Sequence, residues 1–447
     1  MERKNIYFST ILVVMLLIFT ACSTPGSKAP KSSSTLPSPS QAAIEKKVEG
    51  EVTLWNMNAG APRDGVYEQM AKKFMEKYPG TSVKVSHFPS VESQTKMELA
   101  ASSNAMPSVS DQNIKTLSTL RSLGALIPLD SYLSESESIG NILPNLIKVY
   151  RSYSPDGKLY ALPRNAQLTI LWYRSDKFGA PKTWDEFFST IEKATNKANK
   201  EFGYVIRGMD GTYPAMSVAY AYSGIKDFYT ADGKCTINDP KHVEILEKYY
   251  RMYKVYTAES DISAAFKEMT VAFGSGSAQM FLHNTGSYVD HLKNLGVGKF
   301  AATVLPPSAN GVKIEVDQGS PGFCMGVTNN KNYYTAFKLI DFLESAEIQS
   351  LYGKTVGTVP TNVKVFEEDW AKQIPQYQMV LDKLSGKDGT VIVSAPVYMP
   401  DYSKIVSDIG DKGFQKVMIG EKKVKDVLDE LAKAFENALK EYKVNAK

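Results

Sequence analysis

The sequence predicts an α/β protein built from two lobes, and three observations carry this prediction. The chain has 447 residues, which exceeds the roughly 250–300 residues at which a single hydrophobic core usually stops growing. Residues 51–88 have the pattern of a strand, a helix and a second strand, a unit that requires a parallel strand pair. Two polar segments, Arg164–Gln167 and Asp317–Gly322, interrupt apolar β-like runs and indicate where the chain crosses between lobes.

The first unit is defined by its periodicities. Glu51–Asn58 alternates as a strand does, and Asp64–Tyr78 carries apolar residues such as Met70 and Phe74 at helical spacing. Thr81–Phe88 is the second expected strand. The same criteria predict helices over 92–103 and 117–123, a strand over 107–112 and an extended segment over 126–130.

The stretch from Asp156 to Phe188 is the most informative part of the chain. It passes from a turn through a short apolar run to the polar segment Arg164–Gln167, and then to the dense apolar run Leu168–Tyr173. Thr183 is followed three residues later by Glu186, which is the spacing of a capping box. A helix is therefore predicted from Trp184 to Lys200.

The rest of the chain alternates in the same way and shows no internal repeat. Strands are expected over 203–207, 277–282, 299–305 and 323–327. Helices are expected over 216–223, 240–256, 266–273 and 332–343, the last continuing over 347–352. After an extended connector at 357–361, the remainder from Val363 is expected to be helical.

The N-terminus has the pattern of a targeting signal. A basic start is followed by the apolar run Ile11–Phe19, which is too short to span a membrane comfortably, and then by Cys22. This resembles a bacterial lipoprotein signal peptide over residues 1–21, although Phe19 stands where leucine is usual. Residues 22–47 would then be a lipidated cysteine and a disordered tether, rich in Ser, Pro and Lys. A plain secretory peptide with an incidental Cys22 is the alternative.

Composition excludes little else. The formal net charge of +4 gives no reason to expect a nucleic-acid partner. The 25 tyrosines and 19 phenylalanines can line either a core or a polar cleft. Cys235 and Cys324 could pair or remain buried thiols. The four histidines have no metal-ligand spacing, and no nucleophile elbow or P-loop is present, so no cofactor or metal is expected.

A series of motifs identifies a family. They are FMEKYPG at 74–80, LGALIPLD at 123–130, DGKLYALP at 156–163, LWYR at 171–174, PKTWDEF at 181–187, FGSGSAQM at 273–280 and GTVP at 357–360. In this order they resemble the carbohydrate-type extracellular solute-binding proteins of bacterial ABC importers, the group that includes maltose-binding protein. Arg174 departs from the family pattern, where asparagine is usual, and so does the segment Gly286–Tyr288, where a tryptophan is usual.

The resemblance implies a two-lobed, periplasmic-binding-protein-like fold, in which each lobe is a mainly parallel sheet flanked by helices and the lobes close on a ligand. It implies an N-terminal lobe of residues 48–163 plus 323–358 and a C-terminal lobe of 164–322 plus 359–447. The expected function is that of a non-enzymatic importer component. It would be a monomer, held by its lipid on the outer face of the cytoplasmic membrane, and would deliver a mono- or oligosaccharide to permease subunits.

Sugar hydroxyls are bound by amides, carboxylates and guanidinium groups, and sugar rings pack on aromatic faces. The candidates are therefore polar residues at strand ends and crossovers, together with tyrosines in loops or at helix starts. The predicted ligand-binding residues are Asn56, Asn58, Asp111, Gln112, Arg164, Asn165, Gln167, Tyr213, Tyr222, Asn284, Tyr288 and Asp317. Several could instead serve only as caps, turn residues or hinge hydrogen-bond partners.

Three alternatives stay open at this point. The protein could present its ligand to a membrane sensor kinase, or it could be a surface-anchored glycosidase, because paired carboxylates need not be close in sequence. The ligand itself could be acidic, since Arg164, Arg174 and Arg207 could pair with a uronate or lie on the surface.

Overall fold

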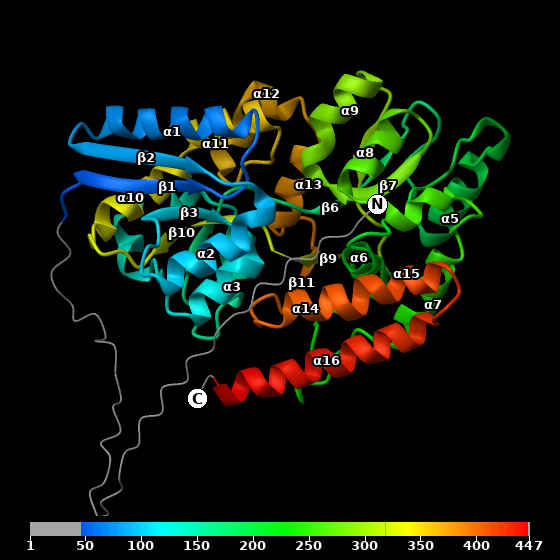
Figure 1. Cartoon of the computed structure of the whole chain (residues 1–447). Coiled ribbons are helices and arrows are strands. Elements are labelled where there is room, and N and C mark those ends of the chain that lie inside the picture. Colours follow the sequence, from blue (N-terminus) through cyan, green and yellow to red (C-terminus); the bar gives the residue numbers. More distant parts are fainter. Residues whose placement is uncertain (1–45, 318, 446–447) are drawn as a thin grey trace, which may run out of the picture. The chain divides into compact units, whose positions relative to one another are not determined.

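The strand–helix–strand unit predicted near the start of the fold is present. In the computed structural model, which describes residues 46–317 and 319–445, β1 (Gly50–Asn56) pairs in parallel with β2 (Thr81–His87). Helix α1 (Arg63–Lys77) connects these two strands and lies along them (Figure 1). Met70 and Phe74 recur at helical spacing and are buried, which is why this segment forms an amphipathic helix on the sheet.

The first sheet has six strands and is mixed. Its order is β2-β1-β3-β10-β4, with β5 also paired to β10. Strand β3 is parallel to β1, whereas β10 is antiparallel to β3, β4 and β5. The expectation of a mainly parallel sheet is therefore wrong in this detail, because β10 enters the sheet after a crossover and runs against its neighbours. The bounds are β3 Val109–Gln112, β4 Leu126–Ile127, β5 Ala161–Pro163 and β10 Gly322–Gly326.

The other two sheets are small. Strand β6 (Thr169–Tyr173) pairs antiparallel with both β7 (Met280–Asn284) and β8 (Ala301–Thr303), so here too the expected parallel arrangement is wrong. A separate parallel pair joins β9 (Ile314–Asp317) to β11 (Val391–Ser394). Strand β11 corrects the prediction that everything after Val363 is helical.

Two further corrections concern segments in the second half. Residues 203–207 run beside β7 without forming a strand; the contacts there are Val205 N–H to the Met280 carbonyl at 3.2 Å and Leu282 N–H to the Tyr204 hydroxyl at 3.2 Å. The predicted continuous helix over 332–352 is broken at Ser345, whose hydroxyl caps a new helix through Ile348 N–H.

The predicted cap of α5 (Trp184–Ala194) is present. The Thr183 hydroxyl accepts from Glu186 N–H at 3.1 Å. The Glu186 carboxylate accepts from the Lys182 N–H at 2.7 Å, one residue before the expected partner. The helix ends at Ala194, earlier than predicted.

Apart from α4, which was not predicted, the remaining α-helices follow the predicted order, with shifted ends. They are α2 Ser93–Ser102, α3 Ile114–Ser122, α4 Pro144–Ser152, α6 Thr212–Ser223, α7 Pro240–Tyr250, α8 Phe266–Gly274, α9 Tyr288–Leu295, α10 Tyr333–Leu343, α11 Ala346–Val356, α12 Asp369–Lys372, α13 Pro375–Leu384, α14 Tyr402–Ile405, α15 Lys412–Met418 and α16 Val424–Asn445. A π-helical turn, Val406–Asp411, joins α14 to α15.

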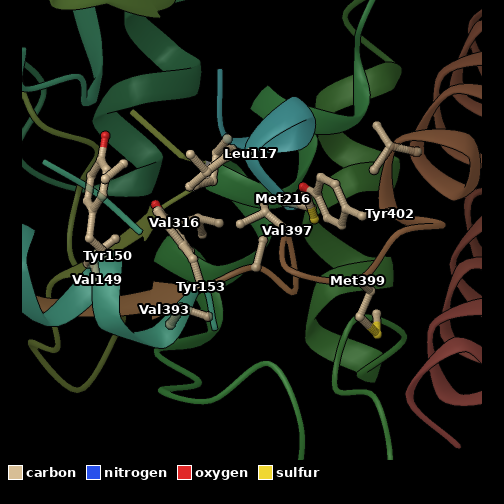
Figure 2. Close-up of a cluster of buried hydrophobic side chains, with 14 of the residues drawn as sticks. Leu117, Val149, Tyr150, Tyr153, Met216, Val316, Val393, Val397, Met399 and Tyr402 are labelled. Carbon is tan, nitrogen blue, oxygen red and sulfur yellow. The ribbon is translucent and has the colours of Figure 1, made fainter. Parts of the chain in front are cut away.

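The apolar core consists of two clusters of buried side chains. The larger cluster runs from the first sheet to α16, and the smaller gathers around β6, β7 and α13. Figure 2 shows a part of the larger cluster in which helices and strands from distant parts of the sequence meet. The labelled residues there include Leu117, Tyr150, Tyr153, Met216, Val316, Val393, Val397 and Tyr402.

Cys235 and Cys324 are both buried and both free. The signal peptide, the lipidation of Cys22 and the tether up to residue 45 lie outside the described residues and stay predictions. Within residues 46–317 and 319–445, no helix combines the length and the apolar character needed to cross a membrane.

Candidate functional site

Three connecting segments lie side by side next to the first sheet. The segment after β5 bonds to the segment before β10 through Arg164 N–H and the Pro321 carbonyl, at 2.9 Å. It also bonds to the connector after α11 through Ala166 N–H and the Val359 carbonyl, at 2.9 Å. Both predicted crossovers therefore run together, and the extended connector at 357–361 joins them.

A buried polar network holds the third connector against the first. Gln349 donates to the Arg164 carbonyl at 3.1 Å and accepts from Thr361 N–H at 3.0 Å. The Thr361 hydroxyl donates to the Glu344 carboxyl at 2.7 Å. Burial raises the pKa of Glu344 well above its usual value, because no solvent stabilises its charge.

Three predicted site residues lie together beneath this junction: Arg164 and Asp111 form an ion pair, and Asn165 hydrogen-bonds to Arg164. The Arg164 guanidinium donates to Asp111 through Nη1 and to the Asn165 side chain through Nε at 3.1 Å. Tyr67 donates to the same Asp111 oxygen at 2.8 Å. The Arg164 and Asp111 side chains are 4% and 2% exposed. The charge of Arg164 is thus matched inside the protein, and ligand contact by these three residues stays a prediction.

A hollow of about 310 Å³ lies beside the junction. Its walls come from both crossovers, β6, β7, the loop before α6, α6 itself, α14 and the π-helical turn. The lining residues are Gln167, Thr169, Arg207, Asp210, Tyr213, Pro214, Leu282, His283, Asn284, Gly319, Tyr402, Val406 and Asp411. Its volume falls at the lower end of the range typical of small-molecule sites, ~300–1,000 Å³.

Several hydrogen-bonding groups line this pocket beside apolar ones. Arg207 donates to the Asp210 carboxylate at 3.0 Å and to the Met209 carbonyl at 3.0 Å. Asp411 accepts from the Thr212 hydroxyl at 2.6 Å and from Thr212 N–H at 2.9 Å, which fixes the start of α6. Such a wall can both donate to and accept from ligand hydroxyls.

Three uncharged polar rings complete the wall. Burial and the nearby Glu315 carboxylate raise the pKa of Tyr213, and burial raises that of Tyr402, so both are neutral phenols. Burial, Arg207 and His291 hold the pKa of His283 well below its usual value, so its imidazole is neutral. Its Nδ1 lies 3.2 Å from the Ser287 hydroxyl, and its Nε2 is buried without a hydrogen-bond partner among the described residues.

The structure brings three of the predicted residues to the pocket: Gln167, Tyr213 and Asn284. Asp317 lies just behind it, 8% exposed, accepting from the Tyr153 hydroxyl and from Gly319 N–H. Burial raises the pKa of Asp317 to about 6, partly countered by the Tyr153 hydrogen bond.

Other predicted residues lie away from the pocket wall. Asn56 is fully buried and its side-chain amide donates to Asp64 at 2.8 Å, while its side-chain amide oxygen accepts from Asn58 N–H at 3.1 Å. Tyr222 donates to Glu244 at 2.7 Å on an exposed face of α6, and Tyr288 packs on Phe300. These contacts account for the side chains of Asn56, Tyr222 and Tyr288, whereas Asn58 is held through its backbone; ligand contact by all four residues stays a prediction.

Gln112 is the exception among the predicted residues of the first sheet. Its side chain is 1% exposed, and both amide atoms lack a partner among the described residues. An unpaired buried amide costs ~1–3 kcal/mol for each group. A ligand hydroxyl or a bound water would satisfy both atoms, and Gln112 therefore stays a predicted ligand contact. Gln318, adjacent to Asp317, lies outside the described residues.

Sequence reasoning did not select Thr169, Asp210, Tyr402 or Asp411 as site residues. Tyr402 and Asp411 come from the C-terminal third, where no strand end or crossover signals a site. Asp210 has φ of 55° in a loop rich in glycine, and this turn composition was the one available signal. Within the described residues, no cluster of His, Cys, Asp and Glu could hold a metal ion.

Comparison with known proteins gives a consistent result. A family model described as bacterial extracellular solute-binding protein matches residues 69–379. An arabinooligosaccharide-binding protein of Bacillus subtilis is 24% identical over 68% of this chain and 68% of its own length. An sn-glycerol-3-phosphate-binding periplasmic protein of Agrobacterium fabrum is 22% identical over 71% of this chain and 76% of its own.

Solved structures share the fold. A solute-binding protein from Thermotoga lettingae, bound with α-D-tagatose, superposes with a TM-score of 0.73 at 22% identity, covering 88% of this chain and 100% of that one. The GacH receptor of Streptomyces glaucescens, solved unliganded and with acarbose, superposes with a TM-score of 0.72 at 20% identity, covering 88% and 99%. The two-lobed, α/β, periplasmic-binding-protein-like fold class is thereby confirmed.

Proposed function

Because the chain belongs to the bacterial extracellular solute-binding proteins, we propose that it is the saccharide-binding component of an ABC importer. The single observation that carries the ligand class is the pocket of about 310 Å³, whose wall alternates hydrogen-bonding groups with neutral phenol and imidazole rings. Amides, carboxylates and a guanidinium bind hydroxyls, and the rings offer faces to sugar C–H groups. The names of the relatives, which bind an arabinooligosaccharide or tagatose, support this ligand class.

The proposal includes a mechanism of closure. The lobes would be residues 48–163 plus 323–358 and residues 164–322 plus 359–447. Ligand bound at Gln167 and Gly319 would contact two of the three connectors directly, and so would stabilise one relative arrangement of the lobes over others. The protein performs no chemistry in this scheme.

The cellular setting is part of the proposal. Lipidation at Cys22 and the tether that follows would hold the monomer at the outer face of the cytoplasmic membrane, where it meets its permease subunits. The lipobox-like sequence before Cys22 supports the anchor. Metabolic labelling with a palmitate analogue would incorporate label into the wild-type protein and not into a Cys22→Ala variant; label in both would contradict the anchor.

Thermal unfolding with a saccharide panel tests the ligand class. The panel would hold arabino-, galacto- and maltooligosaccharides, simple hexoses and polyols. A saccharide at a hundredfold excess over its Kd adds about 2.7 kcal/mol to the free energy of unfolding. At least one member should raise the melting temperature, and calorimetry should confirm its binding. Turnover of a glycoside without such a shift would support an enzyme instead.

A further inference from the structure

Three arginines suggested an acidic ligand in the sequence, and each of them forms an ion pair with a carboxylate of the protein. Arg164 pairs with Asp111 in the interior, and Arg174 pairs with Asp176 at 2.9 Å near the surface. Of the three, Arg207 alone reaches the pocket. None of these guanidinium groups is therefore an unmatched positive charge that would draw in an anion.

The pocket wall itself carries a negative balance. Among its lining residues, Arg207 is the one basic side chain, and Asp210 and Asp411 are both acidic. One positive and two negative charges leave a net charge of −1. His283 adds no charge, because burial and Arg207 keep its imidazole neutral.

The groups behind the wall do not reverse this balance. Glu315 is neutralised by Lys383 at 2.8 Å, with side chains only 6% and 4% exposed. Asp317 adds a further acidic group beside the second crossover. Burial above all raises the pKa of Tyr213, so this pocket phenol is neutral and leaves the charge balance unchanged.

We propose that this pocket selects an uncharged saccharide or polyol and rejects an anionic one, a conclusion that rests on the proposed saccharide-binding function. A carboxylate or phosphate entering the pocket would lose its hydration beside two aspartates and would meet one guanidinium already engaged by Asp210 and the Met209 carbonyl. Hydroxyls avoid this cost, since they can donate to the aspartates and accept from the unused N–H groups of Arg207. Asp210 thus acts as a specificity-determining residue.

Matched ligand pairs that differ only in charge test the proposal. Calorimetric titrations of the wild-type protein would compare galactobiose with digalacturonate, glucose with glucuronate, and glycerol with glycerol 3-phosphate. The neutral member of at least one pair should bind, with its anionic partner at least about tenfold weaker. If the anionic member binds as tightly or more tightly, the charge inference is overturned while the saccharide-binding function stands. If no member of any pair binds, the charge inference fails, and the wider saccharide panel decides the saccharide-binding function separately.

Asp210→Asn isolates the charge mechanism. The loop should tolerate this change, because asparagine adopts the positive φ of 55° readily. With one carboxylate removed and Arg207 released, the ratio of anionic to neutral affinity should rise about tenfold. Asp232→Asn is the control: Asp232 also lies in an exposed turn and pairs with Lys234, away from the pocket. An unchanged ratio in Asp210→Asn, or an equal rise in Asp232→Asn, would overturn the role of Asp210.

Discussion

Two arginine–carboxylate pairs in this protein have the same chemistry and different surroundings. Arg164 and Asp111 are 4% and 2% exposed, and Tyr67 and Asn165 complete their hydrogen bonds. Arg207 and Asp210 are 19% and 69% exposed at the pocket. The first pair links the first crossover to β3, an inner strand of the six-stranded sheet, whereas the second lines the space where a ligand would sit.

The difference shows how burial divides two tasks. A buried charge that loses its partner costs several kcal/mol, so the Arg164 pair constrains the junction of the connectors. An exposed pair is worth ~0–1 kcal/mol and can change without unfolding the protein. The interior pair should therefore affect stability and the pocket pair should affect recognition.

Removing Asp111 should have the largest effect. Asp111→Ala leaves Arg164 charged, buried and unpaired, and should lower the free energy of unfolding by about 3–5 kcal/mol. Urea denaturation measures this change. Asp210→Asn, which tolerates the left-handed backbone at this position, is the matched control and should cost less than about 1 kcal/mol. Equal losses in the two variants would contradict the division of tasks.

The buried Asp317 carboxyl should make the free energy of unfolding depend on pH, which gives a second test of how burial affects a charged group. Its pKa rises from 3.8 to about 6 in the folded protein, so between these values the folded state holds a proton that the unfolded chain releases. This group therefore makes the free energy of unfolding fall as pH rises through that window. Asp317→Asn has no titrating group at this position. Its free energy of unfolding, relative to that of the wild type, should therefore rise by roughly 2–3 kcal/mol between pH 4 and pH 7. Urea denaturation across that range should show the gain; a constant difference between the proteins would contradict it.

The Arg207–Asp210 pair at the pocket should affect ligand affinity, and the expected effect is of intermediate size. Arg207→Gln keeps hydrogen-bonding capacity and removes the guanidinium, so affinity for the saccharide found in the panel should fall about tenfold, or about 1.4 kcal/mol. Calorimetry gives the affinity, and thermal unfolding without ligand should show a change below about 1 kcal/mol. Strong destabilisation without ligand would place Arg207 with the interior pair.

The smallest expected effect separates two tyrosines on one helix. Tyr213 lines the pocket, and Tyr222 of the same helix bonds Glu244 at the surface. Loss of one hydroxyl hydrogen bond is worth ~0.5–1.5 kcal/mol. Tyr213→Phe should therefore weaken saccharide binding a few-fold, whereas Tyr222→Phe should leave binding unchanged. A similar loss in both variants would show that the ligand does not reach Tyr213 selectively.

The sequence predicted best those elements that depend on interactions between residues close together in the chain. Strands β1 and β2, helix α1 and the Thr183 cap follow from periodicity and capping chemistry, and their ends moved by only one or two residues. Strand direction could not be predicted in this way, because β10 and β11 pair with strands far away in the chain. The apparent strand at 203–207 failed for the same reason: its composition suits a sheet, but it forms no ladder with β7.

Among the residues that line the pocket, those at crossovers and strand ends could be selected from the sequence, as for Gln167 and Asn284. The prediction was less informative at Arg164, because sequence cannot show that Asp111 lies against its guanidinium. Tyr402 and Asp411 reach the pocket only through the packing of the C-terminal helices, and composition cannot show that packing.

The most direct test of the account is a crystal structure of the protein with the tightest-binding saccharide of the panel. The account predicts an uncharged sugar in the hollow beside the crossovers, with hydroxyls bonded to Arg207, Asp210 and Asn284 and a ring near Tyr213. The Arg164–Asp111 pair should remain intact. A ligand bound elsewhere, or a ligand carboxylate paired directly with Arg207, would contradict it.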